Sequence, residues 1–314
     1  MCIYQIIFDA FQEAKWFQKL SSAFDEAELL SINETATQPE VKRLIRYDRP
    51  DIILLRDGEA VLTLEKTTEV PTGHNIGQRF ARIVCSAEEG VPVIYFLPFV
   101  AMKHGEYSNP CWLNARLIPA MNKLAEIHNI PVIAVDWECD EDFELIRNGT
   151  QDNFLKRILQ RLTDSNFDFN IPEVKEASEK MKEKYEEAIE RNKGYSAPPS
   201  SVKIISTSVY LGKLKSNFQT VKVPSYFTSR KKTLIYKIGM KYVRSDPYTG
   251  MQLIYDYMYA RKGPTPRDRH MNIVLSMPNI SRSLWEKAAK KSARKDVKLY
   301  SIFRDLIQLP DAII

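Results

Sequence analysis

The 314-residue sequence contains only four cysteines, and no two of them have the CxxC spacing. Cys2, Cys85, Cys111 and Cys139 therefore indicate neither a zinc site nor a disulfide framework, and a reducing cytoplasm is the simplest location. No apolar run approaches the length that spans a bilayer. The N-terminal segment also lacks the basic region and small-residue cleavage site of a signal peptide. The sequence thus predicts a cytoplasmic protein with no membrane partner.

Several functional signatures are missing as well. The chain has no GxGxxG dinucleotide motif, no P-loop and no nucleophile elbow, which disfavours a metal-independent metabolic α/β enzyme. It has no C2H2 zinc-finger spacing and no basic-region heptad. Nucleic-acid binding, if it occurs, must therefore use a surface without a named motif.

The charge that is present is unevenly distributed. Residues 196–314 contain 22 Lys and Arg against 7 Asp and Glu, a net charge of +15, whereas residues 1–195 carry −10. Such asymmetry favours a polyanion such as nucleic acid as partner, the alternative being a solvated basic surface without one. The Gly- and Pro-containing segment 194–201 reads as a linker. We therefore expect a core over residues 1–150, a helical connector over 151–195 and a basic DNA-recognition domain over 196–314.

One stretch of the acidic part has a distinctive pattern. Apolar runs at 52–55 and 60–64 flank Asp57-Gly58, a strong hairpin signal because glycine accepts positive φ. Asp51 opens the first run and Glu65 closes the second, so antiparallel pairing would bring the two carboxylates side by side. Two carboxylates at one end of a hairpin suit Mg²⁺, which binds a few carboxylates together with water and phosphate oxygens.

These residues resemble a known family. Pro50-Asp51, a hairpin and Glu65-Lys66-Thr67 are similar to the motif of the PD-(D/E)XK nuclease superfamily, within it the type II restriction endonucleases. The resemblance covers residues 38–137. It implies a restriction-endonuclease-like core, Asp51 and Glu65 as Mg²⁺ ligands, and hydrolysis of phosphodiester bonds in double-stranded DNA. A palindromic target would also call for a homodimer.

The third member of the motif departs from the family pattern. The family expects a lysine two residues after the glutamate, and this position is Thr67. Lys66 is adjacent, but strand alternation points it to the opposite face. Three alternatives remain: a bulge re-aims Lys66, Thr67 replaces the lysine, or Arg79 or Lys103 supplies the cation. The departure also leaves open a non-catalytic nucleic-acid-binding protein with a degenerate nuclease fold.

Further candidate residues surround the hairpin. A helix is expected from Ile76 to the Glu89-Gly90 C-cap, and Gln78 in its first turn is assigned to a metal-bound water or phosphate. Accessory positions are Glu40, His74, Asn75 and Arg79. Four of these five residues also have a purely structural interpretation. Glu40 is then a first-turn acid, Asn75 an N-cap, and Arg79 and Gln78 part of a solvated helix face.

The remaining pattern predicts the fold class. Residues 38–137 read as helix, two strands, helix, strand, helix and strand, which fits a mixed sheet flanked by helices, an α/β or α+β fold. Residues 1–46 read as mostly helical, with a short helix over 38–46. Helices are also expected over residues 153–162, 172–193 and 281–305, and strands over 202–211 and 233–240. The apolar residues of 251–261 fit both the helical and the strand period. Lys103 and His104 are expected in a loop after the third strand.

The basic domain contains a stiff loop with two prolines. Arginine reads guanine bidentately and lysine neutralises phosphate, so this loop is the segment expected in a DNA groove. Its candidate DNA-binding residues are Arg261, Lys262, Arg267, Arg269 and His270.

Overall fold

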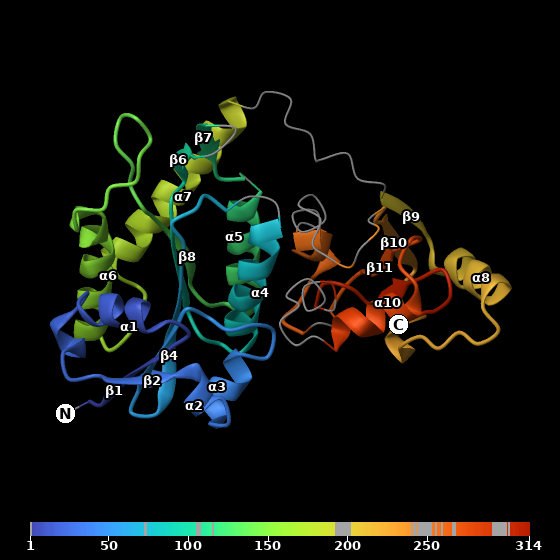
Figure 1. Ribbon diagram of the computed structural model, residues 1–314, viewed down its shortest axis with the longest axis horizontal. Helices are drawn as coiled ribbons and strands as arrows, with labels where there is room; N and C mark the ends of the chain where they lie inside the picture. Colours follow the sequence, from blue (N-terminus) through green and yellow to red (C-terminus); the bar gives the residue numbers. More distant parts are fainter. Residues whose placement is uncertain are drawn as a thin grey trace. The chain divides into compact units, whose positions relative to one another are not determined.

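The computed structural model describes residues 2–71, 74–104, 108–114, 116–191, 202–239, 241, 243, 253–254, 256–258, 260–265, 268–290, 300 and 302–314. The chain divides into two compact units, one comprising Met1–Thr72 and Arg82–Tyr195, the other Gly73–Ala81 and Ser196–Ile314. Each unit has its own mixed sheet with helices packed on it (Figure 1). The predicted class, a mixed α/β protein, is confirmed. The expected linker over 194–201 lies outside the described residues.

The first unit is built on a six-stranded sheet with the order β2-β1-β3-β4-β5-β8. β1, β3 and β4 are antiparallel neighbours, whereas β2 runs parallel to β1, and β4, β5 and β8 run parallel to one another. The strands are β1 (Tyr4–Phe8), β2 (Glu28–Ser31), β3 (Ile52–Arg56), β4 (Glu59–Lys66), β5 (Val93–Leu97) and β8 (Val132–Asp136). The expected hairpin and the two buried parallel strands are therefore present.

The β3–β4 hairpin closes through Asp57 and Gly58, whose φ angles are +52° and +85°. Two positive φ values fit a type I′ turn, which matches the twist of the flanking strands. Next to the turn Leu55 pairs with Ala60, but the following pair is Leu54 with Leu62, so β4 carries one extra residue. This bulge sets the register at the open end of the hairpin. Ile52 pairs with Leu64, so the next position along the strands places Asp51 opposite Glu65. A hairpin without the bulge would place Asp51 opposite Leu64.

Helices cover both faces of this sheet (Figure 1). α1 (Phe11–Gln18) and α6 (Asn153–Asp164) lie on one face, where the Trp16 ring stacks on Phe96 at 5.8 Å. α3 (Pro39–Leu44), α4 (His74–Glu88) and α5 (Leu117–His128) lie on the other. On that face Thr63 of β4 hydrogen-bonds Ser86 of α4 at 2.9 Å. Successive residues of β4 therefore face different helices.

The N-terminal prediction was wrong in part. Residues 1–46 contain the strands β1 and β2 as well as α1, the short helix α2 (Ile32–Thr35) and α3. β1 lies inside the sheet between β2 and β3, and its Ile6 and Ile7 are both fully buried. A strand covered on both faces shows no alternation of apolar and polar residues. Apolar residues from Phe8 to Leu20 recur every three positions, and this spacing indicates a helix, so the strand before it was missed.

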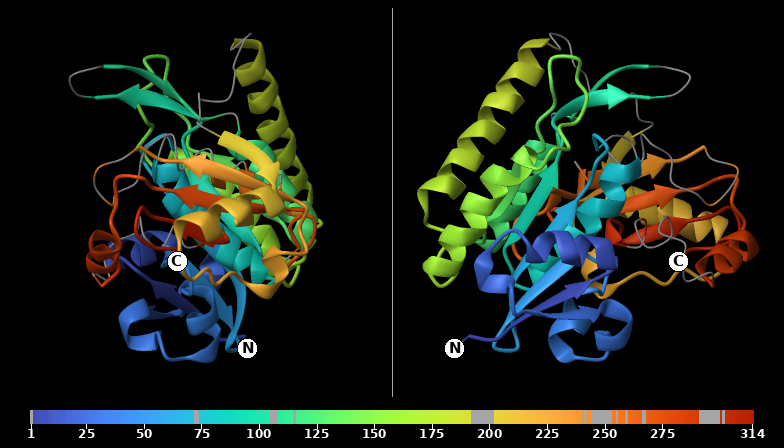
Figure 2. Two further views of the ribbon diagram at one scale, coloured as in Figure 1. Left: turned by 90° about the vertical axis from the view of Figure 1, so that its right-hand side faces the viewer. Right: turned by 60° about the vertical axis from the view of Figure 1, so that its left-hand side comes forward.

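Helices α6 and α7 (Pro172–Arg191) belong to the first unit, although the sequence analysis assigned them to a connector. α7 contacts the edge strand β8 (Figure 2). Met181 of α7 is buried, and its Sδ atom accepts a hydrogen bond from the Ala134 backbone N–H at 3.1 Å. The helix therefore covers a strand edge that would otherwise present unpaired N–H groups.

A small hairpin follows β5 where a loop was expected. β6 (Val100–Lys103) pairs with β7 (Asn109–Trp112) in a separate two-stranded sheet. Lys103 ends β6, and the exposed His104 lies 3.0 Å from Glu144. Neither residue belongs to the β3–β4 hairpin that carries Asp51 and Glu65, and both remain weak candidates for the site.

The second unit contains the four-stranded sheet β12-β11-β10-β9. Its strands are β9 (Val202–Ser206), β10 (Lys232–Lys237), β11 (Met271–Ser276) and β12 (Leu306–Gln308). A strand was expected over 202–211, but β9 ends at Ser206. Ser206 caps the following helix, α8 (Thr207–Asn217), by accepting a hydrogen bond from Val209 N.

The helix expected over 281–305 can be compared with the structure only in part. α10 covers Arg282–Ala289, and the described residues 300 and 302 are also helical. Residues 291–299 lie outside the described part of the chain, and β12 begins at Leu306. In the segment 251–261 the described residues 253–254, 256–258 and 260 are helical. Among all described residues, no helix is both long and apolar enough to cross a bilayer, and the four cysteines are unbridged.

Candidate functional site

Asp51 and Glu65 meet at the open end of the hairpin, and a buried arginine lies between them. The Nη1 atom of Arg82 donates to Asp51 Oδ1 at 2.8 Å and to Glu65 Oε2 at 2.9 Å. The Nε atom of Arg82 lies 3.4 Å from Asp48 Oδ2. Asp51 is 7% exposed, Glu65 1% and Arg82 6%. One nitrogen atom thus marks the point on which the two predicted carboxylates converge.

The backbone fixes each member of this cluster. Asp51 Oδ2 accepts a hydrogen bond from Lys66 N at 2.8 Å, which joins the start of β3 to the end of β4. Thr63 and Glu65 are two residues apart on β4 and share a face, while Arg82 and Ser86 are one turn apart on α4. The Thr63–Ser86 hydrogen bond therefore places α4 in the register at which Arg82 reaches Glu65.

The electrostatics of the cluster favour a charged arginine. Burial lowers the pKa of Arg82, but the carboxylates of Glu65, Asp51 and Asp48 outweigh this effect and raise its pKa above the usual value. Carboxylates directed at one point attract a cation, and a divalent ion is attracted more strongly than a singly charged guanidinium.

The residues present fit Mg²⁺ by donor chemistry. Mg²⁺ is bound by one or two carboxylates and completes its shell with water and phosphate oxygens. Asp51 Oδ1 and Glu65 Oε2 supply two such oxygens directed at one point. Within the ranges described, no group of three or more His, Cys, Asp or Glu side chains is arranged to hold a metal. A metal here would therefore depend on these two carboxylates and on oxygens from solvent and substrate.

Lys66 points away from this pair, as strand alternation predicts. Its Nζ atom lies 4.1 Å from the ring centroid of Trp16 and 5.6 Å from that of Trp137. Burial lowers the pKa of Lys66. The only bulge in the β3–β4 pairing lies upstream, between Leu54 and Leu55 in the β3 register, so it does not re-aim Lys66. The lysine instead makes a cation–π contact on the opposite face of the sheet.

Thr67 does not take the place of the missing lysine either. Its backbone N–H donates to Phe96 O at 3.0 Å, and its Oγ1 exchanges hydrogen bonds with the backbone of Glu69. A cation that does contact both carboxylates is Arg82, which was not among the candidate residues named from the sequence. The available signal was that Arg82 is the one charged residue between Phe80 and Ala87, an otherwise apolar and small-residue run.

Among the accessory candidates, Glu40 has its hydrogen-bond partners away from the carboxylate pair. Glu40 lies toward the turn of the hairpin, where its Oε2 accepts from Ala60 N at 3.1 Å, and hydrogen bonds from Arg43 lower its pKa. Arg79 is a half-buried residue of α4. His74, Asn75 and Gln78 belong to the same helix, and their side chains lie outside the described part of the structure.

The predicted DNA-binding loop uses its arginines internally. Arg261 is 1% exposed and donates to Tyr257 Oη and to the carbonyl oxygens of Gly263 and Pro264. Arg269 is buried, and its Nη1 lies 3.1 Å from Asp305 Oδ2. Both guanidinium groups therefore stabilise the second unit and are not presented to solvent.

Other basic residues of the second unit are exposed. Lys262 is exposed, His270 is half-buried with Nδ1 3.0 Å from Ala260 O, and Arg267 lies outside the described residues. Most of the exposed lysines were not among the candidate residues; in the described part of residues 196–314 they are Lys203, Lys213, Lys215, Lys222, Lys231, Lys232, Lys237, Lys241, Lys262, Lys287 and Lys290.

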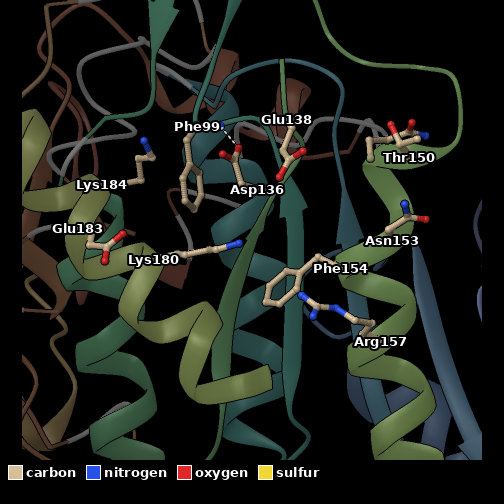
Figure 3. A pocket seen from close by; sticks show the side chains of 11 residues that line it. Phe99, Asp136, Glu138, Thr150, Asn153, Phe154, Arg157, Lys180, Glu183 and Lys184 are labelled. Atoms are coloured by element: carbon tan, nitrogen blue, oxygen red, sulfur yellow. Dashed lines mark hydrogen bonds between the residues drawn. The ribbon is translucent and has the colours of Figure 1, made fainter. Parts of the chain in front are cut away.

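A separate cavity of about 500 Å³ lies in the first unit between α6, α7 and the carboxyl end of β8 (Figure 3). Asp136 lies between the two helices and accepts a hydrogen bond from Phe99 N at 2.9 Å. Burial raises the pKa of Asp136 to about 6. The walls carry charges of both signs, including Arg157, Lys180 and Glu183. None of the residues of the carboxylate–arginine cluster lines this cavity.

The comparisons with known proteins leave the geometry to carry the functional argument. The site consists of two convergent carboxylates, a buried arginine and a backbone N–H that orients one carboxylate. Comparison of the chain with protein-family models, with curated proteins and with solved structures finds no match in any of the three.

Proposed function

We propose that this protein is a Mg²⁺-dependent endonuclease that hydrolyses phosphodiester bonds in double-stranded DNA, as type II restriction enzymes of the PD-(D/E)XK type do. The observation that carries the proposal is the convergence of Asp51 Oδ1 and Glu65 Oε2 on one point, at 2.8 and 2.9 Å from Arg82 Nη1. The sequence motif names these same two residues. Motif and geometry are independent observations, because the motif contains no information on Arg82.

The arrangement of elements also supports the proposal. The hairpin that carries the two carboxylates is followed by α4 and by β5, which runs parallel to β4. This matches the element order that the resemblance to the nuclease core implies. Glu65 lies on β4, and Asp51 immediately precedes β3; both strands have neighbours on each side in the six-stranded sheet, so the carboxylates are held by rigid elements.

In this proposal Asp51 and Glu65 would hold the metal. The metal would supply polarisation of the scissile phosphate and increased acidity of a water molecule. The Lys66 N–H holds Asp51 Oδ2 and so keeps Oδ1 directed toward Glu65. The guanidinium of Arg82 holds the two carboxylates directed at one point in the metal-free protein.

The second unit would supply DNA binding. The net charge of +15 over residues 196–314 and the exposed lysines of this segment favour contact with a phosphate backbone. Since one active site cuts one strand, cleavage of both strands at a palindromic site would use a homodimer. The unbridged cysteines agree with a cytoplasmic location.

Cleavage of a mixture of genomic DNA fragments tests the activity, because such a mixture contains every short recognition sequence. We expect discrete products with wild type and Mg²⁺, and none with EDTA, Asp51→Asn or Glu65→Gln. Glu144→Gln, which alters an exposed acid beside His104, is the matched control and should cut normally. Equal cleavage by Asp51→Asn would remove the hairpin from the active site.

A second candidate is a non-catalytic nucleic-acid-binding protein. Arg82 between the carboxylates and Thr67 in place of the lysine both favour it. In that case the ion cluster would be purely structural. DNA binding without cleavage in Mg²⁺ or Mn²⁺, and no uptake of either metal, would distinguish this candidate from the nuclease.

A further inference from the structure

Arg82 stands where a metal would have to bind. A metal ion held by Asp51 Oδ1 and Glu65 Oε2 would lie between these two atoms, and Nη1 of Arg82 lies between them in the structure. Mg²⁺ binds carboxylate oxygens at about 2.0–2.1 Å, shorter than either N–O contact. The guanidinium nitrogen and the metal therefore exclude each other from this position.

Arg82 cannot release the two carboxylates by losing a proton. Arginine remains protonated in proteins, and the surrounding carboxylates raise its pKa further. The nitrogen can leave the two carboxylates only if the side chain moves. Because Arg82 is buried, the moved guanidinium also needs another anionic partner.

Asp48 is that partner within the same cluster. Its Oδ2 lies 3.4 Å from Arg82 Nε, a longer contact than the two made by Nη1, and Asp48 is itself buried. A guanidinium can turn about its own stem so that its donors shift from one carboxylate group to another. The chain thus provides a second ion pair for Arg82 next to the first.

We propose that Arg82 is an internal counter-ion that competes with the divalent metal for Asp51 and Glu65, and that Asp48 receives its guanidinium when the metal binds. This inference rests on the proposed function for the presence of a metal site. It adds that Arg82 is a positioning residue that holds the carboxylates together in the metal-free protein. Metal affinity is then set by the difference between the two ion pairs of Arg82.

Metal affinity, measured without substrate, tests the proposal. Binding of Mn²⁺ to the full-length protein is followed by electron paramagnetic resonance, with Mg²⁺ as competitor. Arg82→Met, which removes the competing charge but keeps a long apolar side chain, should bind Mn²⁺ at least tenfold more tightly than wild type. Arg46→Met is the matched control, because Arg46 pairs with Glu88 and Glu89 and not with the carboxylate pair. It should leave the affinity unchanged.

The role of Asp48 has its own test, and its single variant Asp48→Asn does not depend on the folding of Arg82→Met: unchanged Mn²⁺ binding by Asp48→Asn would overturn the assignment. Asp48→Asn keeps Arg82, Asp51 and Glu65 and should weaken Mn²⁺ binding several-fold. In the double variant Asp48→Asn/Arg82→Met this effect should disappear, because Asp48 acts through Arg82. An undiminished effect in the double variant would mean that Asp48 acts only as a nearby charge, and would overturn its assignment as the receiving partner.

The outcomes separate this inference from the proposed nuclease function. Equal or weaker Mn²⁺ binding by folded Arg82→Met overturns the competition and leaves the metal site intact. Binding by Arg82→Met alone supports the competition and favours the non-catalytic candidate for the wild type. If neither protein binds Mn²⁺ in a manner sensitive to Asp51→Asn, both the inference and the metal-dependent function fail.

Discussion

The backbone N–H of Lys66 donates a hydrogen bond to Asp51 Oδ2 at 2.8 Å, and this contact joins the open ends of β3 and β4. The other end of the hairpin is closed by the Asp57-Gly58 turn. Asp51 therefore uses one carboxylate oxygen to hold the strands together and directs the other to Arg82. The two carboxylate oxygens of one side chain thus have different partners.

Substitution of Asp51 should reduce stability in two steps. Asparagine has a single acceptor oxygen, so Asp51→Asn can satisfy Lys66 N–H or Arg82 but not both, and Asp51→Ala satisfies neither. Each buried donor left without an acceptor costs about 1–3 kcal/mol. We expect the order of stability wild type, Asp51→Asn, Asp51→Ala in urea unfolding followed by circular dichroism. Equal stability of the two variants would contradict the structural role of Oδ2.

The turn glycine should tolerate replacement poorly. Gly58 has a φ of +85°, which a Cβ atom disfavours, although no atom lies within 4 Å of an added Cβ. Gly58→Ala should therefore lower the free energy of unfolding by about 1 kcal/mol through backbone strain alone. Gly212→Ala is the control, because Gly212 lies within α8, and alanine there should stabilise by up to about 1 kcal/mol. Thermal unfolding of both variants measures the contrast.

Asp136 should make stability fall as the pH rises. Its pKa in the folded protein is about 6, above the usual value for aspartate. Between about pH 4 and pH 6 the folded state binds the extra proton, so its contribution is fully present at low pH and is lost as the pH passes the folded pKa. Asp136→Asn removes this loss and keeps an acceptor for Phe99 N.

Urea unfolding of wild type and Asp136→Asn from pH 4 to pH 7 checks this expectation. The stability of the variant relative to wild type should increase by about 2 kcal/mol across the range. A constant difference would show that the burial of Asp136 is not linked to its protonation.

Lys66 should be dispensable for metal binding. Its Nζ atom contacts the Trp16 ring on the face of β4 opposite Glu65. Lys66→Met keeps the aliphatic packing and loses a cation–π contact, so its stability should change by no more than about 1 kcal/mol. Mn²⁺ affinity should equal that of wild type, whereas Glu65→Gln should lose it. A large loss of affinity in Lys66→Met would return this lysine to the site.

Asp305 should be essential to the second unit. Its carboxylate lies 3.0 Å from Arg230 Nη1 and 3.1 Å from Arg269 Nη1, and it accepts a hydrogen bond from Ile273 N at 2.8 Å. Asp305→Ala would leave two buried guanidinium groups without this partner and should cost about 3–5 kcal/mol. Lys262→Ala, at an exposed position of the predicted DNA-binding loop, should change stability by less than about 0.5 kcal/mol.

Hydrogen exchange can show which strands lose stability in Asp305→Ala. We expect faster exchange of amides in β10 and β11, with those of β3 and β4 unaffected. Unchanged exchange in β11 would contradict a structural role for the buried ion cluster.

Local sequence determined the hairpin and much of the helical pattern. Asp57-Gly58 specifies a two-residue turn because both positions require positive φ, and the apolar runs on either side supply the strands. The apolar spacing of α4 and the continuous apolar runs of β5 and β8 identify these elements for the same reason, since each pattern reflects local periodicity. The motif likewise selected Asp51 and Glu65 before any geometry was known.

Only the tertiary structure decided which cation meets these carboxylates. Arg82 reaches them because a bulge in β4 sets Glu65 opposite Asp51 and because Thr63 and Ser86 fix α4 against the strand. The burial of Arg269 is decided in the same way, because its partner Asp305 comes from a distant segment. From sequence alone, a charged residue is expected to be exposed. Contacts between distant segments supply the partners that allow the charges of Arg82 and Arg269 to be buried.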